Sequence, residues 1–414
     1  MKLKLTDGAA GANMAFAIKL FMAITAFVGL AMGFSDALLA NYFKDAYDVN
    51  AQQRGFIEFP REMPGVLAIF VIAALAGLRD IRTALAAHAL TAAALIALAF
   101  LRPAFPVMLI FLFLYSMGVH MYLALGDSIA LSLAQKQNMG SMLGRINSVR
   151  MALFMFAGVV TFFGFRRGLF DFETPVAVFL LAAVCLTLAC LLFLLLTRIA
   201  PAGENGPARR STKLVFRRAY LRYYVICALF GGRKQIMLVY SPWVLIDLLD
   251  FGADTMSILS VAGAFIGIFF MPLVGRWIDR FGVRNVMMAE AFAFISVYIA
   301  YGFLSRWISH NAVVLTGAGM MLVYLLNIID RMSAQFAMVR AVYLRSIALT
   351  PDDVTPSLSL GMSLDHVIGI AFSFVCGTIW YIWGPEYVFL LAGILSLANL
   401  FAARGIGIKE SFSA

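Results

Sequence analysis

A set of ionisable residues stands inside long apolar segments of this chain, each long enough to cross a lipid bilayer. A charged side chain at membrane depth costs roughly 2.5–3.5 kcal/mol, so it normally faces a bundle interior or a water-filled cavity. Such residues mark the path of a substrate or an ion. The residues concerned are Asp36, Glu58, Arg61, Glu62, His120, Asp127, Arg233, Lys234, Asp330, Arg331 and Asp365.

Two adjacent cations, Arg233 and Lys234, stand near the middle of segment 219–248. Arginine offers a planar fork to a carboxylate or phosphate, and lysine offers a point charge. One interpretation is a binding site for an anionic substrate, and the other is a buried ion pair with Asp36 or Asp330. The two are compatible, because a substrate can replace an internal partner. Further candidate substrate contacts, which packing could also explain, are His120, Tyr240, Asn327, Asp330 and Arg331.

Carboxylates inside the apolar segments are candidates for carrying a proton. A proton-coupled carrier needs an acid whose environment lets it titrate at physiological pH. We expect this role for Asp36, Glu62 and Asp127, in that order. Two alternatives stay open: Glu58, Arg61 and Glu62 share a helix face and can form a local salt-bridge cluster, and His120 can be a hydrogen-bonded core histidine rather than a proton relay.

Composition places the chain in a membrane. Of its 414 residues 63% are hydrophobic and 13% charged, with a mean hydropathy of +0.91, against about 45–50% apolar and about 25% charged in soluble domains. The four cysteines lie in apolar runs without metal-ligand spacing. We expect twelve spans: 14–42, 54–77, 83–101, 105–134, 142–165, 175–197, 219–248, 255–277, 284–304, 312–345, 356–382 and 386–404.

Lysine and arginine concentrate in alternate loops, which predicts that both termini are cytoplasmic. The formal charge of +10 then reflects membrane topology and not nucleic-acid binding. Segment 198–218 is rich in Pro, Gly and basic residues and predicts a cytoplasmic linker between halves 1–197 and 219–414. The halves resemble each other, since a shift of 199 positions superposes Gly33 on Gly232 and Asp80 on Asp279. The short loops fit the plasma membrane of a bacterium.

The loop Gly275-Arg276-Trp277-Ile278-Asp279-Arg280-Phe281-Gly282-Val283-Arg284 matches the pattern G-x-x-x-D-R-x-G-x-R. With it the chain resembles the major facilitator superfamily. The resemblance implies an all-α membrane protein with twelve transmembrane helices in two pseudo-symmetric six-helix bundles, whose first, fourth, seventh and tenth spans line a central cavity. It also implies a cytoplasmic gate. The alternative is that the charges of the same residues only fix the membrane topology. That gate consists of Gly275, Asp279, Arg280, Gly282, Arg284, Asp80 and Arg145.

These observations predict a secondary active transporter that works by alternating access. We expect it to be a proton-coupled monomer that moves a small organic anion or zwitterion across the bacterial inner membrane, with the proton gradient as driving force and no cofactor. The alternatives are a proton-driven multidrug exporter and a lipid flippase on the same fold. The chain lacks HExxH, GxSxG and Walker motifs, which argues against an enzyme.

Overall fold

The computed structural model describes residues 2–75, 77–133, 139–199, 216–311, 317–350 and 353–407. Within these ranges the regular backbone is helical, as a bilayer requires, because a helix satisfies its polar backbone groups internally. Nine of the described helical segments are long and apolar enough to cross a membrane. Most of the predicted linker, residues 200–215, lies outside the described ranges.

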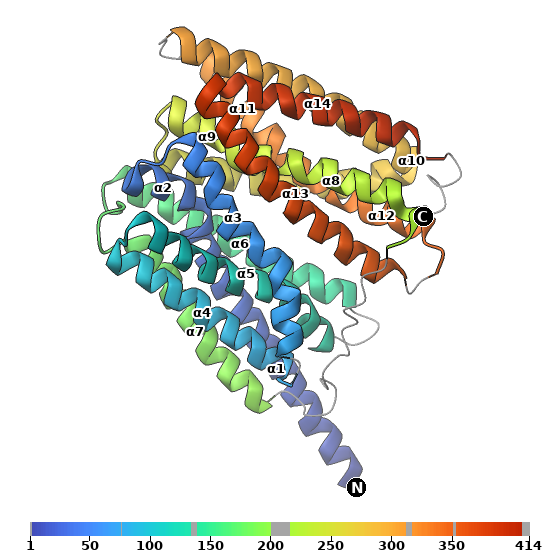
Figure 1. Ribbon diagram of the computed structural model, residues 1–414. Helices are drawn as coiled ribbons and strands as arrows, with labels where there is room; N and C mark the ends of the chain where they lie inside the picture. The colour runs from blue at the N-terminus through green and yellow to red at the C-terminus, as the bar shows by residue number, and fades with distance from the viewer. Residues whose placement is uncertain are drawn as a thin grey trace. The chain divides into compact units, whose positions relative to one another are not determined.

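The helices correspond in order to the twelve predicted spans (Figure 1). The first span is broken near its end, and the next five are single helices. They are α1 (Lys2–Phe34), the 3-10 turn η1 (Asp36–Leu38) and α2 (Leu39–Tyr47), then α3 (Ala51–Ala74), α4 (Asp80–Leu101), α5 (Phe105–Leu133), α6 (Met139–Arg166) and α7 (Ala177–Ile199).

The second half is less regular, because its seventh and tenth spans are interrupted. It begins with η3 (Arg218–Tyr220), α8 (Leu221–Gln235), the π-helix η4 (Ile236–Tyr240), α9 (Ser241–Trp243) and the π-helix η5 (Val244–Leu248). It continues with α10 (Ala253–Asn311), α11 (Ala318–Met332), the 3-10 turn η6 (Ser333–Phe336), α12 (Ala337–Ile347), α13 (Val354–Trp383) and α14 (Pro385–Arg404).

Helix α10 contains both the eighth and the ninth span, divided at Gly282. This glycine has φ +76° and ψ 159°, which side-chain-bearing residues rarely adopt. The turn predicted from the loop motif is therefore present. Among the described residues, a Cβ placed at Gly275 would meet Met338, at an ordinary contact distance of 3.9 Å.

Contacts divide the chain into two compact units. The first unit comprises Met1–Tyr42 and Leu67–Arg210, and the second comprises Phe43–Val66 and Ser211–Ala414. Segment 43–66 thus groups with the second unit, whereas the sequence assigns it to the half 1–197. Helix α3 crosses from the second unit to the first between Val66 and Leu67.

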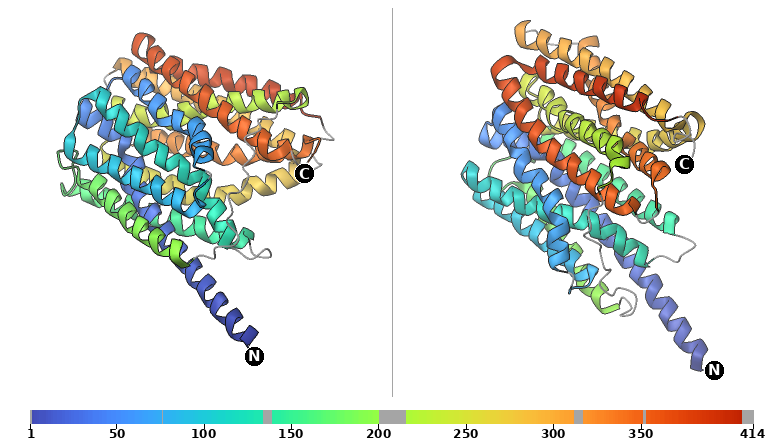
Figure 2. Two further views of the ribbon diagram at one scale, coloured as in Figure 1. Left: turned by 60° about the horizontal axis from the view of Figure 1, so that its bottom comes forward. Right: turned by 45° about the vertical axis from the view of Figure 1, so that its right-hand side comes forward.

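Within each unit the long helices pack side by side. In the first unit α4 lies against α5 and α7, and α1 lies against α6 and α7. In the second unit α8 lies against α13 and α14, and α10 lies against α14, as Figures 1 and 2 show. Close packing of α8 on α13 depends on small residues, since a Cβ at Gly231 would lie 2.6 Å from the carbonyl oxygen of Asp365.

Candidate functional site

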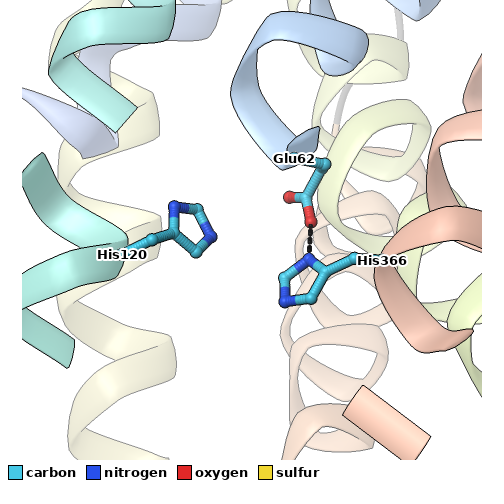
Figure 3. A group of neighbouring side chains, drawn as sticks. All are labelled: Glu62, His120 and His366. Carbon is cyan, nitrogen blue, oxygen red and sulfur yellow. Dashed lines mark hydrogen bonds and ion pairs between the residues drawn. The ribbon is translucent and has the colours of Figure 1, made fainter. Parts of the chain in front are cut away.

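The clearest charged contact at membrane depth joins α3 to α13. His366 Nδ1 donates a hydrogen bond of 2.6 Å to Glu62 Oε2 (Figure 3). Glu62 stands between two prolines of α3, Pro60 and Pro64. Gly65 allows the imidazole to come close, because a Cβ at this position would lie 2.7 Å from His366 Cε1. The sequence selected Glu62 as a proton carrier, and the structure supplies its partner.

A second pair involves Asp365, the residue just before His366 in α13. Lys234 Nζ of α8 is 3.1 Å from Asp365 Oδ1, and the charge of Lys234 also acts on Glu62. We name Glu62, His366, Lys234 and Asp365 the charged cluster. Their side chains are 12%, 15%, 16% and 16% exposed, in that order. The charged cluster is therefore shielded from solvent without being sealed, as a binding or proton-exchange site requires.

Arg54, Glu58 and Arg61 form a separate ion network on α3. Glu58 Oε1 accepts a hydrogen bond from Arg54 Nη1 at 2.5 Å and another from Arg61 Nη1 at 2.9 Å. The Arg54 guanidinium also lies 5.7 Å from the Phe43 ring and 5.9 Å from the Trp243 ring. The local salt-bridge interpretation thus holds for Glu58 and Arg61. The sequence did not indicate Arg54 as a network member, because it stands at the start of the predicted span 54–77, where a charged loop residue is expected.

Arg233 is buried inside the second unit, with 2% of its surface exposed. It pairs with Glu290 of α10 and contacts the rings of Phe230 at 5.3 Å and Phe294 at 4.9 Å. The expected partners, Asp36 or Asp330, were wrong. Successive helical residues point about 100° apart, so Arg233 turns toward α10 while Lys234 turns toward α13.

Four other predicted substrate residues bond to protein groups within the second unit. Tyr298 Oη donates to Asp330 Oδ1 at 3.0 Å, Asn327 Nδ2 donates to Ser241 Oγ at 3.2 Å, and Arg331 Nε donates to Asn327 Oδ1 at 3.1 Å. The Tyr240 hydroxyl donates to the Ser373 carbonyl oxygen. Asp330, Asn327 and Tyr240 are fully buried. This geometry supports a structural role for these residues.

Three further candidates belong to the first unit. Asp36 and Asp127 are exposed at the surface of the structure. His120 Nδ1 donates to the Ser116 carbonyl oxygen at 2.9 Å, as a hydrogen-bonded core histidine would. Proton-carrying roles for the two aspartates stay predictions that burial does not support.

The first unit contains a pocket near His88. This histidine, on the third span, and Glu290, on the ninth span in the second unit, are only 3% and 4% exposed. His88 lies 4.2 Å from Tyr122, measured between ring centroids, and its Nε2 has no hydrogen-bond partner among the described residues. The pocket lining also includes Thr91 and Arg150. His88 and Glu290 therefore belong to the interior of their units.

The predicted cytoplasmic gate is only partly visible in the contacts. Asp279, Arg280 and Arg145 are exposed, and Arg280 lies 5.2 Å from the Phe281 ring. Asp80 accepts a hydrogen bond of 2.7 Å from Ser128 Oγ of α5. The Nε atom of Arg284 has no hydrogen-bond partner among the described residues. A gating role for these residues stays a prediction.

Comparison with known proteins identifies the family. The Major Facilitator Superfamily model matches residues 21–344. The chain belongs to this superfamily. No curated protein matches the sequence.

Solved transporters share the fold. A mutant of the nucleoside transporter NupG is 17% identical, with a TM-score of 0.77, and the match covers 94% of this chain and 99% of that one. A D-xylose–proton symporter is 15% identical, with a TM-score of 0.64, covering 96% and 98%. The xylose transporter XylE from E. coli is 14% identical, with a TM-score of 0.67, covering 95% and 99%. At these identities the likeness shows a membrane-transporter fold and leaves the substrate open.

Proposed function

We propose that the protein is a proton-coupled secondary active transporter that moves a small organic anion or zwitterion by alternating access. We place it in the bacterial inner membrane as a monomer with both termini in the cytoplasm. The single observation that carries the proposal is the Glu62–His366 hydrogen bond, which links α3 to α13 beside the Lys234–Asp365 pair.

The Glu62–His366 pair is suited to couple a proton to movement. Histidine is the side chain that titrates nearest neutral pH, and a protonated imidazole beside a carboxylate forms an ion pair. Loss of one proton weakens that attraction. The strength of this contact decides how firmly α3 is held to α13. Helix α3 also continues from the second unit into the first. Alternating access requires such contacts to break and re-form.

The cluster also favours an anion over a cationic drug. Both of its carboxylates, Glu62 and Asp365, have a basic partner within 3.1 Å. A cation would need an acid with no such partner, whereas a carboxylate can compete with Asp365 for Lys234. A proton-driven multidrug exporter and a lipid flippase are therefore alternatives that the test must distinguish.

Transport by the purified protein in proteoliposomes tests this proposal. The probes are radiolabelled succinate, benzoate and alanine, with tetraphenylphosphonium for the drug alternative. We expect one acid or zwitterion to accumulate under an inside-alkaline pH gradient and to be released by a protonophore. Glu62→Gln should retain exchange of that probe but lose gradient-driven accumulation.

The matched control is Glu386→Gln, which changes another buried glutamate, paired with Arg306 at 3.3 Å and outside the charged cluster. It should accumulate the probe as the wild type does. Equal accumulation by Glu62→Gln and the wild type would refute the coupling role of Glu62. Transport of tetraphenylphosphonium alone would favour the multidrug exporter.

A further inference from the structure

Arg340 of α12 is a cation at membrane depth without a counter-ion of its own. It lies seven residues before the helix end at Ile347, which is about 10 Å into the span. Its Cζ is 3.2 Å from the centroid of the Phe230 ring. Across the described ranges no carboxylate pairs with it, and its buried Nη1 has no hydrogen-bond partner. A lone guanidinium is costly at this depth, so an oxyanion would stabilise it.

The acids near Arg340 already have basic partners. Asp365 and Glu290 are the carboxylates whose charges act on Arg340. Asp365 pairs with Lys234, and Glu290 pairs with Arg233. Both nearby carboxylates are thus paired with other cations, and the positive charge of Arg340 has no paired carboxylate among the described residues. An incoming anion would neutralise it.

One of these two pairs is poorly formed and can exchange partners. Lys234 and Asp365 are 3.1 Å apart but not aligned for a hydrogen bond, so Asp365 Oδ1 accepts none from the described residues. The Arg233–Glu290 pair is hydrogen bonded and almost completely buried. Lys234 is therefore the cation that an entering carboxylate can take.

We propose that Lys234 and Arg340 together bind the carboxylate or other oxyanion of the substrate, which displaces Asp365 from Lys234. Phe230 lies under the guanidinium and supplies an apolar surface for the rest of the solute. Arginine can bind two carboxylate oxygens at once, and lysine adds a point charge. This site rests on the proposed function and names its anion-binding residues.

The site differs from the one that the sequence indicates. There Arg233 and Lys234 act together, whereas here Lys234 acts with Arg340, and Arg233 serves the interior of the second unit. The alternative is that Arg340 only packs on Phe230 as a cation–π contact, which stabilises by about 0.5–2 kcal/mol without any ligand. The two predict different effects of Asp365. If Asp365 competes with substrate for Lys234, removing its charge must strengthen anion binding.

Thermal-shift titration of the full-length protein in neutral detergent tests the site. The probes are benzoate, succinate and inorganic phosphate at constant ionic strength, with chloride as the reference anion. We expect at least one probe to raise the wild-type Tm in a saturable way. Arg340→Gln should weaken its apparent affinity about tenfold or more, because the guanidinium fork is lost. Arg340→Lys should recover part of the loss.

Two further variants make the test specific. Arg345→Gln changes an exposed arginine on the same helix and should bind the probe as the wild type does. Asp365→Asn should bind it more tightly, because the carboxylate whose charge acts on both Lys234 and Arg340 is then neutral. If Arg340→Gln does not fold, Arg340→Lys supplies the comparison, and its affinity should lie below that of the wild type. Unchanged affinity in Arg340→Gln, or weaker affinity in Asp365→Asn, would overturn the site.

The outcomes separate this site from the proposed function. If the anion is transported with a proton but Arg340→Gln binds it normally, only the site is wrong. If anions bind through Lys234 and Arg340 but Glu62→Gln still accumulates them, the proton-coupling proposal is wrong and the site stands. If phosphatidylglycerol in nanodiscs protects the wild type and none of the soluble anions does, the ligand is a lipid phosphate and the soluble substrate class is refuted.

Discussion

His366 Nδ1 and Glu62 Oε2 lie 2.6 Å apart although 304 positions separate the two residues in the chain. The contact holds the middle of α3 to α13 within the second unit. A substitution that weakens it should lower the stability of this unit.

Replacing His366 by leucine should destabilise the protein by about 1–3 kcal/mol, because the shielded Glu62 carboxylate loses its donor. The double variant Glu62→Gln/His366→Leu should lose less than the sum of the single losses, as expected for residues in direct contact. Unfolding in detergent, followed by tryptophan fluorescence, measures all three variants. Strictly additive losses would contradict a direct interaction.

Breaking the Arg233–Glu290 pair should cost about 3–5 kcal/mol, since Arg233→Ala leaves Glu290 charged and buried. The double variant Arg233→Met/Glu290→Leu should be more stable than Arg233→Ala, because no buried charge remains. Anion affinity of the double variant should equal that of the wild type. If its affinity fell while its stability recovered, Arg233 would be a substrate ligand after all.

Gly55→Ala should separate α3 from α13, because a Cβ at Gly55 would overlap the Ser373 carbonyl oxygen and lie 2.6 Å from Tyr240 Oη. Backbone cannot move aside as a flexible side chain can, so we expect a loss of about 1–3 kcal/mol. The control is Gly393→Ala in α14, where nothing lies within 4 Å of the added methyl group. Thermal unfolding should show the control to be unchanged or slightly more stable.

Asp353, just before α13, should make stability depend on pH. Burial would raise the pKa of its carboxyl group, but hydrogen bonds from Tyr220 and Arg217 outweigh burial and hold the pKa below its ordinary value of 3.8. A group whose pKa is lowered by folding stabilises the folded state above the unfolded pKa, and this contribution disappears as pH falls through the folded pKa.

The Tm difference between the wild type and Asp353→Asn should therefore be full at pH 7 and shrink only below about pH 4. Scanning calorimetry across this range measures it. Asp279→Asn, which changes an exposed acid, serves as the control and should show a much smaller difference. A difference that stayed constant down to low pH would exclude the carboxylate as its source.

The fold could be predicted from sequence because its determinants are local. The length of each apolar segment indicates a span. The residue types around Gly282 predict the turn between the eighth and ninth spans. The pattern of charges also selected Glu62 and Lys234, which do lie in the charged cluster. The order of the spans and two members of the charged cluster could therefore be predicted from the sequence.

Partners could not be predicted, because they depend on which way each side chain turns. Arg233 and Lys234 are neighbours in sequence, yet one pairs with Glu290 and the other with Asp365. Arg340 was overlooked because it stands close to the basic end of the predicted span 312–345, where a further arginine has no distinguishing signal.

The two π-helical stretches of the seventh span, η4 and η5, flank Ser241, Pro242 and Trp243. Each wide turn contains an extra residue relative to the α-helical hydrogen-bond pattern. Tightening η4 by that one residue would rotate everything beyond it by about 100° around the helix axis. Trp243, now 6.0 Å from Lys44 and 5.9 Å from Arg54, would leave both cations. Such a rotation would let the part of this span that follows η4 change its bonding partners with little sliding along the helix axis.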